Sequence, residues 1–415
     1  MSRHLLFLAG TVIIPVLLTA RTNDGGYEQT NLVANKADYH PLLVDENLVN
    51  AWGIALRPPG AGGHIWVSNA RTGSSSEFIG DVPGNPLRQD GLKLVRLDQP
   101  RFTDHGYAFV TGQVYNSASD VTGQPEEFHV AGPAENRKKS PTEPIQGGFS
   151  GPAKFVFATE DGCINAWSAN TAVAMSTAPV IIDYSKTAPS LPSPANCVFT
   201  GVALTNNAFT SDAYAKAGGN HLFAADIRNN VIRVFDNKWK DVTGAWHFQT
   251  PASVGHLHPF NIVDLGGHLF VTYAEFDPAS DEGQEQIVGA GLGHVVEYNE
   301  DGTLVKDFHT RGVLNAPWGV ALAPATFGTF ANDVLVANFG DGTIAAFDPA
   351  SGDFAGYLRA PDTRIISIDG LWGLTFGNGV GLGDADALYF TAGPNNEEDG
   401  LFGRLNARGG AKPKS

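Results

Sequence analysis

The sequence has few of the residues that would suggest a disulfide framework or a basic binding surface. Only two cysteines and two methionines occur in 415 residues, and charged residues make up 17% of the chain. Two cysteines can form at most one disulfide, which cannot stabilise a chain of this length, so a hydrophobic core must stabilise it. Acidic residues outnumber basic ones by 43 to 27, which gives a net charge of −16. This balance argues against binding to nucleic acid or to an anionic membrane surface, because both would repel the chain.

Glycine, proline and phenylalanine are abundant instead. The chain has 49 glycines, 25 prolines and 25 phenylalanines, and 42% of its residues are hydrophobic. This hydrophobic content excludes a disordered chain, and the turn-forming residues exclude an all-helical one. The composition favours many short strands joined by turns.

A long hydrophobic run occurs only at the amino end. Residues 1–4 carry a basic charge, and residues 5–20 are almost entirely apolar. This pattern is typical of a secretory signal peptide over residues 1–20, with an uncleaved membrane anchor as the alternative. We therefore expect a secreted or periplasmic protein with no stable membrane insertion after signal removal. In such an oxidising compartment Cys163 and Cys197 could pair, and two buried thiols are the equal alternative.

One short phrase recurs along the chain. Residues 50–56, 316–322 and 370–376 are three copies built around a Trp-Gly pair, and residues 199–204 and 259–265 are looser copies. Each copy precedes a second apolar run that ends in a polar residue. A third run often follows a glycine turn, as after Asp-Gly at residues 161–162, 301–302 and 341–342. The pattern predicts three strands and a turn in each repeat.

The spacing of the phrase indicates six repeats. Gly53, Gly201, Asn261, Gly319 and Gly373 occupy the same place in the five copies, and the steps between them are 148, 60, 58 and 54 residues. The long first step contains residues 154–167, which have the second and third runs without a clear first phrase. A divergent sixth repeat therefore lies there, and each repeat averages roughly 66 residues, as in a propeller blade with generous loops.

The sequence thus predicts an all-β fold, a six-bladed β-propeller. Blades stacked around an axis cover each other's faces, which explains strands that are apolar without alternation. The last repeat is one strand short, so we expect residues 28–34 to complete the sixth blade. We predict one monomeric domain over residues 27–405, followed by a polar tail over 406–415. Trp52, Trp318 and Trp372 are interpreted as structural wedges between blades.

Several phrases also carry a resemblance to known proteins. They are the three around the tryptophans just named, together with residues 30–33, 155–162 and 389–395. On these phrases the chain resembles an exported bacterial family of six-bladed propellers whose function is unassigned. It is loosely similar to NHL-repeat propellers and to the SMP-30 and gluconolactonase class. The resemblance implies architecture, because a fold does not determine an activity.

Polar side chains at equivalent strand ends make a candidate site at the propeller axis. The ends of the second strands predict a polar ring of Asn69, Glu160, Asp226, Glu275, Asn338 and Asn395. Residues beside the first strands could enter the same channel: Asn50, His258, Asn315 and Asp369. Carboxylate and amide oxygens suit Ca²⁺, so Glu160, Asp226 and Glu275 are candidate metal ligands. Alternatively, these residues cap strands and satisfy loop amides.

Three functions are compatible with this sequence. The first is a secreted scaffold that binds a protein, a glycan or a small molecule at its axial mouth and loop face, as the long segment 81–151 suggests. The second is a calcium-dependent hydrolase of the lactonase or gluconolactonase type, which the axial ring of oxygen-bearing side chains suggests. The third is an enzyme that catalyses a rearrangement or cyclisation by the shape of its pocket.

Overall fold

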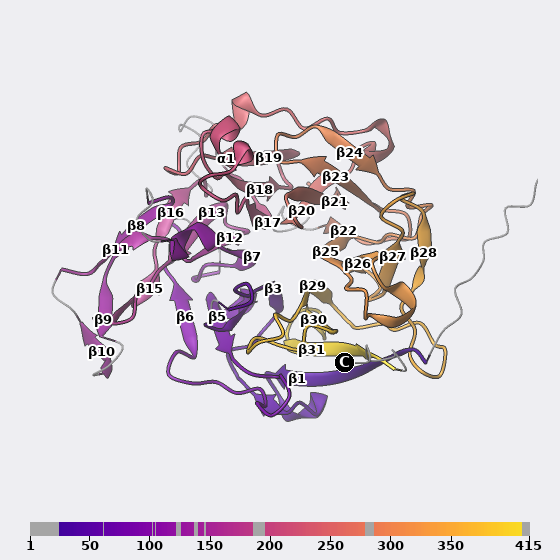
Figure 1. The fold of residues 1–415 in the computed structure, drawn as a ribbon, viewed down its shortest axis with the longest axis horizontal. Coiled ribbons are helices and arrows are strands. Elements are labelled where there is room, and N and C mark those ends of the chain that lie inside the picture. Colours follow the sequence, from indigo (N-terminus) through magenta and orange to yellow (C-terminus); the bar gives the residue numbers. More distant parts are fainter. Residues whose placement is uncertain are drawn as a thin grey trace, which may run out of the picture.

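Six small antiparallel sheets form a ring around a central axis (Figure 1). This computed structural model describes residues 25–408 apart from 61, 102, 104, 122–125, 137–139, 145–146, 186–195 and 279–285. The prediction of a six-bladed β-propeller is confirmed. The predicted signal peptide and most of the predicted tail lie outside the described residues, so both stay predictions.

The strands follow the chain from the axis outward in each of the first three blades. Blade 1 contains β3 (Ala51–Ala55), β4 (Ile65–Asn69), β5 (Ser74–Phe78) and β6 (Leu94–Leu97), with β15 (Thr177–Ala178) at its outer edge. Blade 2 contains β7 (Val110–Tyr115), β12 (Phe155–Thr159), β13 (Cys163–Trp167) and β16 (Val180–Asp183). Blade 3 contains β17 (Phe199–Leu204), β18 (Leu222–Asp226) and β19 (Val231–Phe235).

The last three blades repeat this order. Blade 4 contains β20 (His258–Asp264), β21 (His268–Phe276), β23 (Gly293–Asn299) and β24 (Leu304–Asp307), with β22 (Gln286–Ile287) paired to β21. Blade 5 contains β25 (Pro317–Leu322), β26 (Val334–Asn338), β27 (Ile344–Phe347) and β28 (Phe354–Tyr357). Blade 6 contains β29 (Leu371–Phe376), β30 (Ala387–Ala392), β31 (Leu401–Ala407), β1 (Tyr27–Ala34) and β2 (Leu43–Val44).

Helical structure is confined to short connections. They are α1 (Asp212–Ala217) and the 3₁₀ turns η1 (Ala37–Tyr39), η2 (Ala70–Thr72), η3 (Ser117–Asp120), η4 (Thr243–Ala245), η5 (Ala252–Val254) and η6 (Gly328–Phe330). In the part of the chain that the structure describes, no helix is long and apolar enough to cross a membrane.

The ring closes where the two ends of the chain meet. β1 pairs antiparallel with β31, from Tyr27 opposite Ala407 to Ala34 opposite Leu401, and the two strands lie side by side in Figure 1. The predicted closing strand is therefore confirmed. β31 extends to Ala407, two residues beyond the predicted domain boundary, because its last residues pair with the start of β1. The Tyr27 hydroxyl donates to the Phe327 carbonyl oxygen at 3.0 Å, which ties this closure to blade 5.

The first strand of blade 2 was not predicted from the sequence. β7 carries Thr111-Gly112, which matches Thr200-Gly201 of β17, but Gln113 replaces the apolar residue that follows the glycine in the other phrases. Residues 154–167 supply β12 and β13, as expected. The segment 81–151 is not one insertion, because β6 and β7 within it are blade strands. The strands of this segment that do not belong to a blade lie between β7 and β12.

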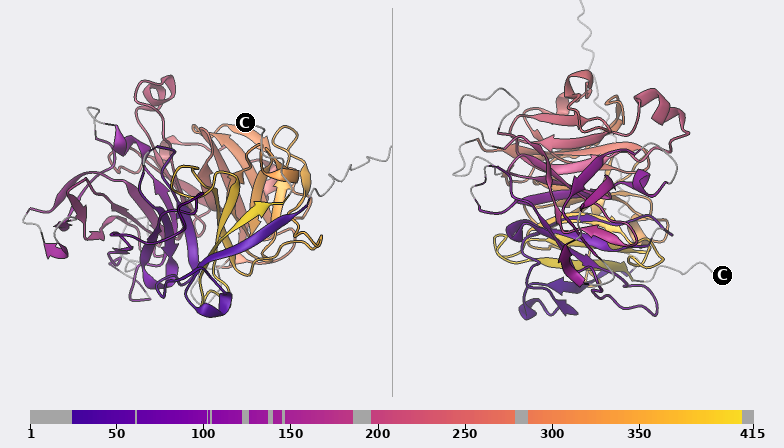
Figure 2. Two further views of the ribbon diagram at one scale, coloured as in Figure 1. Left: turned by 60° about the horizontal axis from the view of Figure 1, so that its bottom comes forward. Right: turned by 90° about the vertical axis from the view of Figure 1, so that its left-hand side faces the viewer.

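This added structure forms strand pairs outside the ring (Figures 1 and 2). β8 (His129–Gly132) pairs with β11 (Phe149–Pro152), and β9 (Ala134–Asn136) pairs with β10 (Ser140–Pro144) and with β14 (Val173–Met175). The pairs are anchored by Phe128 and Val130, which are buried against blade 2.

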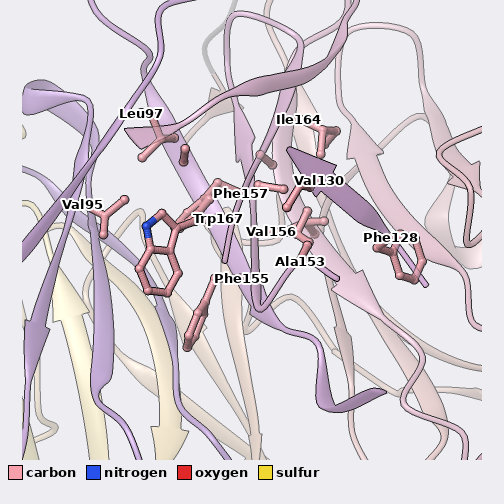
Figure 3. Packing of buried hydrophobic residues seen from close by; sticks show 14 of the residues in the cluster. Val95, Leu97, Phe128, Val130, Ala153, Phe155, Val156, Phe157, Ile164 and Trp167 are labelled. Atoms are coloured by element: carbon pink, nitrogen blue, oxygen red, sulfur yellow. The ribbon is translucent and has the colours of Figure 1, made fainter. Parts of the chain in front are cut away.

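Apolar side chains fill the space between neighbouring blades. Between blades 1 and 2, Val95 and Leu97 of β6 face Phe155 and Trp167 (Figure 3). Trp66 of blade 1 stacks on Phe155 with ring centroids 4.0 Å apart. Such contacts explain why strands like β12 are buried on both faces.

The two cysteines are buried free thiols in this structure. Cys163 lies in β13, and its Sγ donates to Asp183 Oδ1 at 3.4 Å. Cys197 lies just before β17 and accepts from Asn229 Nδ2 at 3.7 Å. Burial raises the pKa of both thiols, so they behave as small core residues.

Candidate functional site

The innermost strands approach one another closely at one level of the axis. Gly53, Gly112, Gly201, Gly319 and Gly373 occupy equivalent places in five innermost strands, with Asn261 in blade 4. A Cβ on Gly53 would lie 2.5 Å from the Thr111 carbonyl oxygen, and one on Gly112 would lie 2.9 Å from the Val202 nitrogen. Each glycine therefore lets its strand approach the next blade closely.

Side chains tie the innermost strands together at this level. Gln113 Nε2 donates to the Gly53 carbonyl oxygen at 3.1 Å, across blades 1 and 2. Thr111 Oγ1 donates to the Phe199 carbonyl oxygen at 2.8 Å, across blades 2 and 3. Asn261 Nδ2 donates to the Trp318 carbonyl oxygen at 2.9 Å, across blades 4 and 5. Backbone groups at the inner sheet edges thus find partners without a neighbouring strand.

Aromatic rings plug the axis on one side of the glycines. Trp52 stacks on Trp372 with ring centroids 3.7 Å apart, and Trp318 meets both rings edge-on at 6.3 and 6.1 Å. Phe339 stacks on the other side of the cluster, 4.0 Å from Trp372. The three rings pack on one another, whereas the sequence predicted wedges between adjacent blades. They pack against one another at the axis because equivalent positions of a ring converge there.

The axis has two ends, which differ in their side chains. We call the end where the innermost strands begin the polar mouth, because the predicted polar residues flank the strands there. We call the end where the innermost strands finish the apolar mouth. The aromatic plug and the glycine level lie between them.

Two amides of the predicted ring are fully buried at the polar mouth. Asn69 Nδ2 donates to Ser74 Oγ at 3.1 Å and to Ser76 Oγ at 3.0 Å, within blade 1. Asn338 accepts from the Asn315 backbone nitrogen at 3.0 Å and donates to Thr343 Oγ1 at 3.0 Å, within blade 5. Both side chains hold the turn after the second strand, which is the strand-capping role that the sequence analysis left open.

Asp226 is the most buried carboxylate of the ring, with an exposed fraction of 0%. Its Oδ2 accepts from Arg233 Nε at 3.1 Å and from Asn229 Nδ2 at 2.8 Å. Its Oδ1 accepts from the Val198 backbone nitrogen at 3.2 Å. A neighbouring arginine therefore compensates this charge inside blade 3.

The other three members have less uniform surroundings. Glu160 is buried, and its backbone nitrogen donates to the Phe109 carbonyl oxygen at 3.0 Å. Glu275 forms an ion pair with His256 Nε2. Asn395 is exposed in a left-handed turn with φ at 59°, and its Nδ2 donates to Asp399 Oδ2 at 3.2 Å. The strand registers place only Asn69, Asp226 and Asn338 at equivalent positions, opposite the residue two places before the innermost-strand glycine. In blades 2, 4 and 6 that position holds Thr159, Tyr273 and Ala392, so Glu160, Glu275 and Asn395 lie one to three residues further along and the predicted six do not form one ring.

The four further candidates lie at the same mouth. Asn50 Nδ2 donates to Glu397 Oε2 at 2.7 Å, and its Oδ1 accepts from Trp372 Nε1 at 3.0 Å. Asn315 Oδ1 accepts from the Gly289 backbone nitrogen at 2.7 Å. The remaining contacts join His258 Nδ1 to the Ile227 carbonyl oxygen at 2.5 Å and Asp369 Oδ2 to the Asn395 backbone nitrogen at 2.9 Å.

The described residues do not fit a calcium ion. Ca²⁺ needs several oxygen ligands directed at one point. Among the residues that the structure describes, no three His, Cys, Asp or Glu side chains form a group that could hold a metal, so Glu160, Asp226 and Glu275 make no such group. Asp226 is paired with Arg233, and Glu275 with His256. The expected calcium site is not supported, and we derive no chemistry through a metal.

The apolar mouth opens into a cavity of about 650 Å³. All six innermost strands contribute to its lining. The residues that follow the glycine level are Ile54–Leu56, Gln113–Tyr115, Val202–Leu204, Ile262–Asp264, Val320–Leu322 and Leu374–Phe376. Most of these side chains are apolar, so the cavity offers a surface from which water is readily displaced.

Polar groups are few in this cavity. Each innermost strand stands at the end of its sheet, so its inner edge has no strand partner. Asp264, at the end of β20, is the lining residue that carries a carboxyl group. Burial, with a further contribution from Glu300, raises the pKa of Asp264 to about 6, although the Gly267 backbone nitrogen donates to its Oδ1 at 2.9 Å.

The apolar mouth was not predicted from the sequence. Its signal was present in the recurring phrase, because the three residues after the glycine are all apolar in blades 1, 3 and 5, and two of the three residues at this place are apolar in blades 4 and 6. Polar side chains at strand ends gave the stronger prediction, since those residue types suggest chemistry. Only the ring arrangement shows that the apolar triplets converge around an open volume.

Comparisons with known proteins find distant relatives of this chain. No family model matches the chain. The mimivirus protein R648, which is uncharacterised, is 28% identical over 90% of this chain and 78% of its own length. A second uncharacterised mimivirus protein, L690, is 34% identical over 45% of this chain and 49% of its own length. These relatives are viral, so they do not support the bacterial and exported parts of the expected resemblance.

Some solved structures are similar to this chain at low sequence identity. A streptogramin B lyase is 11% identical, with a TM-score of 0.41, over 93% of this chain and 99% of its own. A gluconolactonase from Xanthomonas campestris is 13% identical, with a TM-score of 0.35, over 61% of this chain and 81% of its own. A glucose dehydrogenase is 12% identical, with a TM-score of 0.43, over 91% of this chain and 98% of its own.

Proposed function

We propose that the protein is a binding scaffold that takes a small, largely apolar molecule into the axial cavity at the apolar mouth. The observation that carries this proposal is a cavity of about 650 Å³ lined by the ends of all six innermost strands. Pockets of roughly 300–1,000 Å³ with an apolar lining and few polar groups are typical of small-molecule sites.

The surroundings of the cavity favour a ligand that enters from one side. The stacked tryptophans and the close glycine contacts close its inner end. A ligand there would be covered by six strands whose positions are fixed by the closed ring. Such a preformed site costs little ordering on binding. Apolar area that the ligand removes from water contributes about 25 cal/mol per Å² before the costs of association.

The rim of the cavity supports the same interpretation. Leu322 is 50% exposed at the end of β25, and Leu56, Leu265 and Phe376 are only partly buried. Exposed apolar side chains that surround an apolar hollow are a common mark of a binding site. At the polar mouth, by contrast, the large apolar rings are buried in the plug.

A neutral fluorescent probe tests this function directly. N-phenyl-1-naphthylamine brightens in apolar surroundings, and we expect it to bind the wild-type protein saturably with one site per chain. Thr375→Trp places a large ring at a half-buried position of the lining and should weaken binding about tenfold, or roughly 1.4 kcal/mol. Leu42→Trp, at a highly exposed position outside the lining, is the matched control and should bind as the wild type does.

Two results would overturn the proposal. One is the absence of saturable probe binding to the folded wild-type protein. The other is equal binding by Thr375→Trp and Leu42→Trp when both unfold at the wild-type temperature. Secretion, glycan or protein binding at the polar mouth, and the hydrolase and rearrangement alternatives stay predictions. Lactone hydrolysis compared between the wild type, Asp226→Ala and Glu160→Ala is the assay for the hydrolase alternative.

A further inference from the structure

One blade departs from the apolar pattern at the cavity. The third residue after the glycine level is Leu56, Tyr115, Leu204, Leu322 or Phe376 in five blades. In blade 4 the same position holds Asp264. Among the described residues that line the cavity, Asp264 is the one with an acidic or basic side chain. A single carboxylate at an otherwise apolar or aromatic position indicates selection for a charge in the ligand.

Asp264 also stands beside a second hollow. A groove of about 580 Å³ lies between blades 3 and 4, and its lining includes Thr205, His221, Trp246, Gly267 and Glu300. Gly266 lines the axial cavity, whereas the adjacent Gly267 lines the groove. Asn206 likewise lines the axial cavity, whereas the adjacent Thr205 lines the groove. The turn after Asp264 is therefore part of the wall between the cavity and the groove.

The charges around this wall are mainly negative. Glu300 approaches from the β23–β24 turn and accepts from Asn207 Nδ2 at 2.6 Å, and its proximity helps to raise the pKa of Asp264. Asp301 beside it faces Lys216, whose ammonium is 3.8 Å away and highly exposed. His268 of β21 is paired with Glu297 of β23 at 2.7 Å. From blade 3, residues 205–207 contribute no charge.

The Asp264 carboxylate keeps capacity for a ligand. Its one hydrogen bond within the described residues is the donation from Gly267 to Oδ1. A carboxylate offers about four acceptor positions, so Oδ2 can accept from a ligand. An ammonium group fits this position best, because it donates hydrogen bonds and also offsets the repulsion from Glu300.

We propose that the ligand of the apolar mouth is a hydrophobic amine. Its apolar body lies in the axial cavity, and its ammonium group lies beside Asp264 at the wall next to the blade 3–blade 4 groove. This inference rests on the proposed function, because it needs the cavity to be the binding site. It adds the chemical class of the ligand and the residue that selects it.

The pairing has a definite dependence on pH. An alkylammonium stays charged well above neutral pH, as a lysine side chain does. The carboxyl group of Asp264, with a pKa of about 6, gains its negative charge as the pH rises through that value. Amine affinity should therefore increase between pH 5 and pH 8. The affinity of an uncharged analogue should not follow this titration.

The test compares n-octylamine with 1-octanol as displacers of N-phenyl-1-naphthylamine. We expect the wild type to bind the amine about tenfold more tightly than the alcohol at pH 8 and to lose most of this preference at pH 5. Asp264→Asn and Asp264→Leu should remove the preference for the amine over the alcohol, each measured against the probe affinity of that variant; the leucine variant restores the residue type of three other blades. Asp38→Asn removes the same charge at an exposed position of η1 and should keep the preference.

The outcomes separate this inference from the function on which it rests. If the probe binds but the amine is not preferred, or if both Asp264 variants keep the preference, the inference is overturned and the apolar site stands. If the probe does not bind the folded protein at all, the proposed function fails and the inference fails with it. Loss of the preference in Asp38→Asn as well would assign it to the overall negative charge, which also overturns the role of Asp264.

Discussion

The two mouths of the propeller axis are built from the two ends of the same six strands, yet they differ in what their side chains do. At the polar mouth, Asn69, Asp226 and Asn338 direct their polar atoms into their own blades. At the apolar mouth, the side chains surround a cavity of about 650 Å³. The polar mouth has the residue types associated with chemistry, and the apolar mouth has the space for a ligand.

This difference follows from where the aromatic plug lies. Trp52, Trp318 and Trp372 fill the axis beside the polar mouth, so the polar side chains there surround packed rings. Buried polar groups must find partners, and in this position they find them within their blades. Residue type alone is therefore a poor guide to a site in a ring, because the same asparagine or aspartate can serve a turn.

The contrast predicts that changes at the plug act mainly on stability. Trp372→Ala removes a fully buried ring that stacks on Trp52 and Phe339 and donates to Asn50. We expect the free energy of unfolding to fall by about 3–5 kcal/mol, as for other buried tryptophans. Urea unfolding followed by tryptophan fluorescence and circular dichroism measures this change. Phe376→Ala, at the half-buried rim of the apolar mouth, should lower the free energy of unfolding by less. An equal loss in the two variants would contradict the difference between the plug and the apolar mouth.

The next effect concerns the buried carboxylate of the polar mouth. Asp226→Asn removes the closer carboxylate of Arg233 inside blade 3 and leaves it Asp241, whose Oδ2 lies 4.0 Å from Nη1, and we expect a loss of about 3 kcal/mol in unfolding free energy. Added Ca²⁺ should leave the melting temperature of both proteins unchanged. A calcium-dependent rise in the wild type that the variant lacks would instead show that Asp226 belongs to a metal site.

A smaller loss of unfolding free energy is expected at the glycine level, between the two mouths. In Gly319→Ala the new Cβ would be too close to the Trp372 carbonyl oxygen, so two innermost strands must move apart. We expect a cost of roughly 1–3 kcal/mol. Gly381→Ala is the control, because a Cβ there would meet no atom within 4 Å. Similar melting temperatures for the two variants would contradict close backbone packing at the axis.

The smallest effect should be seen at the apolar mouth, and it depends on pH. Burial raises the pKa of Asp264 from 3.8 to about 6, so between these values the folded state binds more protons than the unfolded state. The wild type therefore loses stability as the pH rises through this window. Asp264→Asn has no such titration. The melting temperature of the variant relative to the wild type should be higher at pH 7.5 than at pH 4, and a constant difference would refute the raised pKa.

Much of the fold was accessible from the sequence because it repeats. The Trp-Gly phrases located the innermost strands β3, β25 and β29, and the unpaired residues 28–34 located the closing strand. β7 was missed because Gln113 interrupts the apolar pattern after Gly112. That side chain is polar for a tertiary reason, since it donates to the carbonyl oxygens of Gly53 and Trp66 in the neighbouring blade.

The candidate site was less accessible. Aligning strand ends predicted Asn69, Asp226 and Asn338 at one end of the axis, but it could not show that Asp226 and Asn338 are hydrogen-bonded within their own blades. The apolar triplets were visible in the sequence as ordinary core. Asp264 differed from its counterparts in the other blades, but this became meaningful only once β7 completed the set of six.

The sequence by itself determined the number of blades, the strand order and the closure of the ring, because these depend on periodic burial that any repeat must satisfy. Tertiary structure alone decided which end of the axis is open. Ring geometry brings six equivalent positions together, and the volume left there depends on whether the converging residues are three tryptophans or a set of smaller aliphatic side chains.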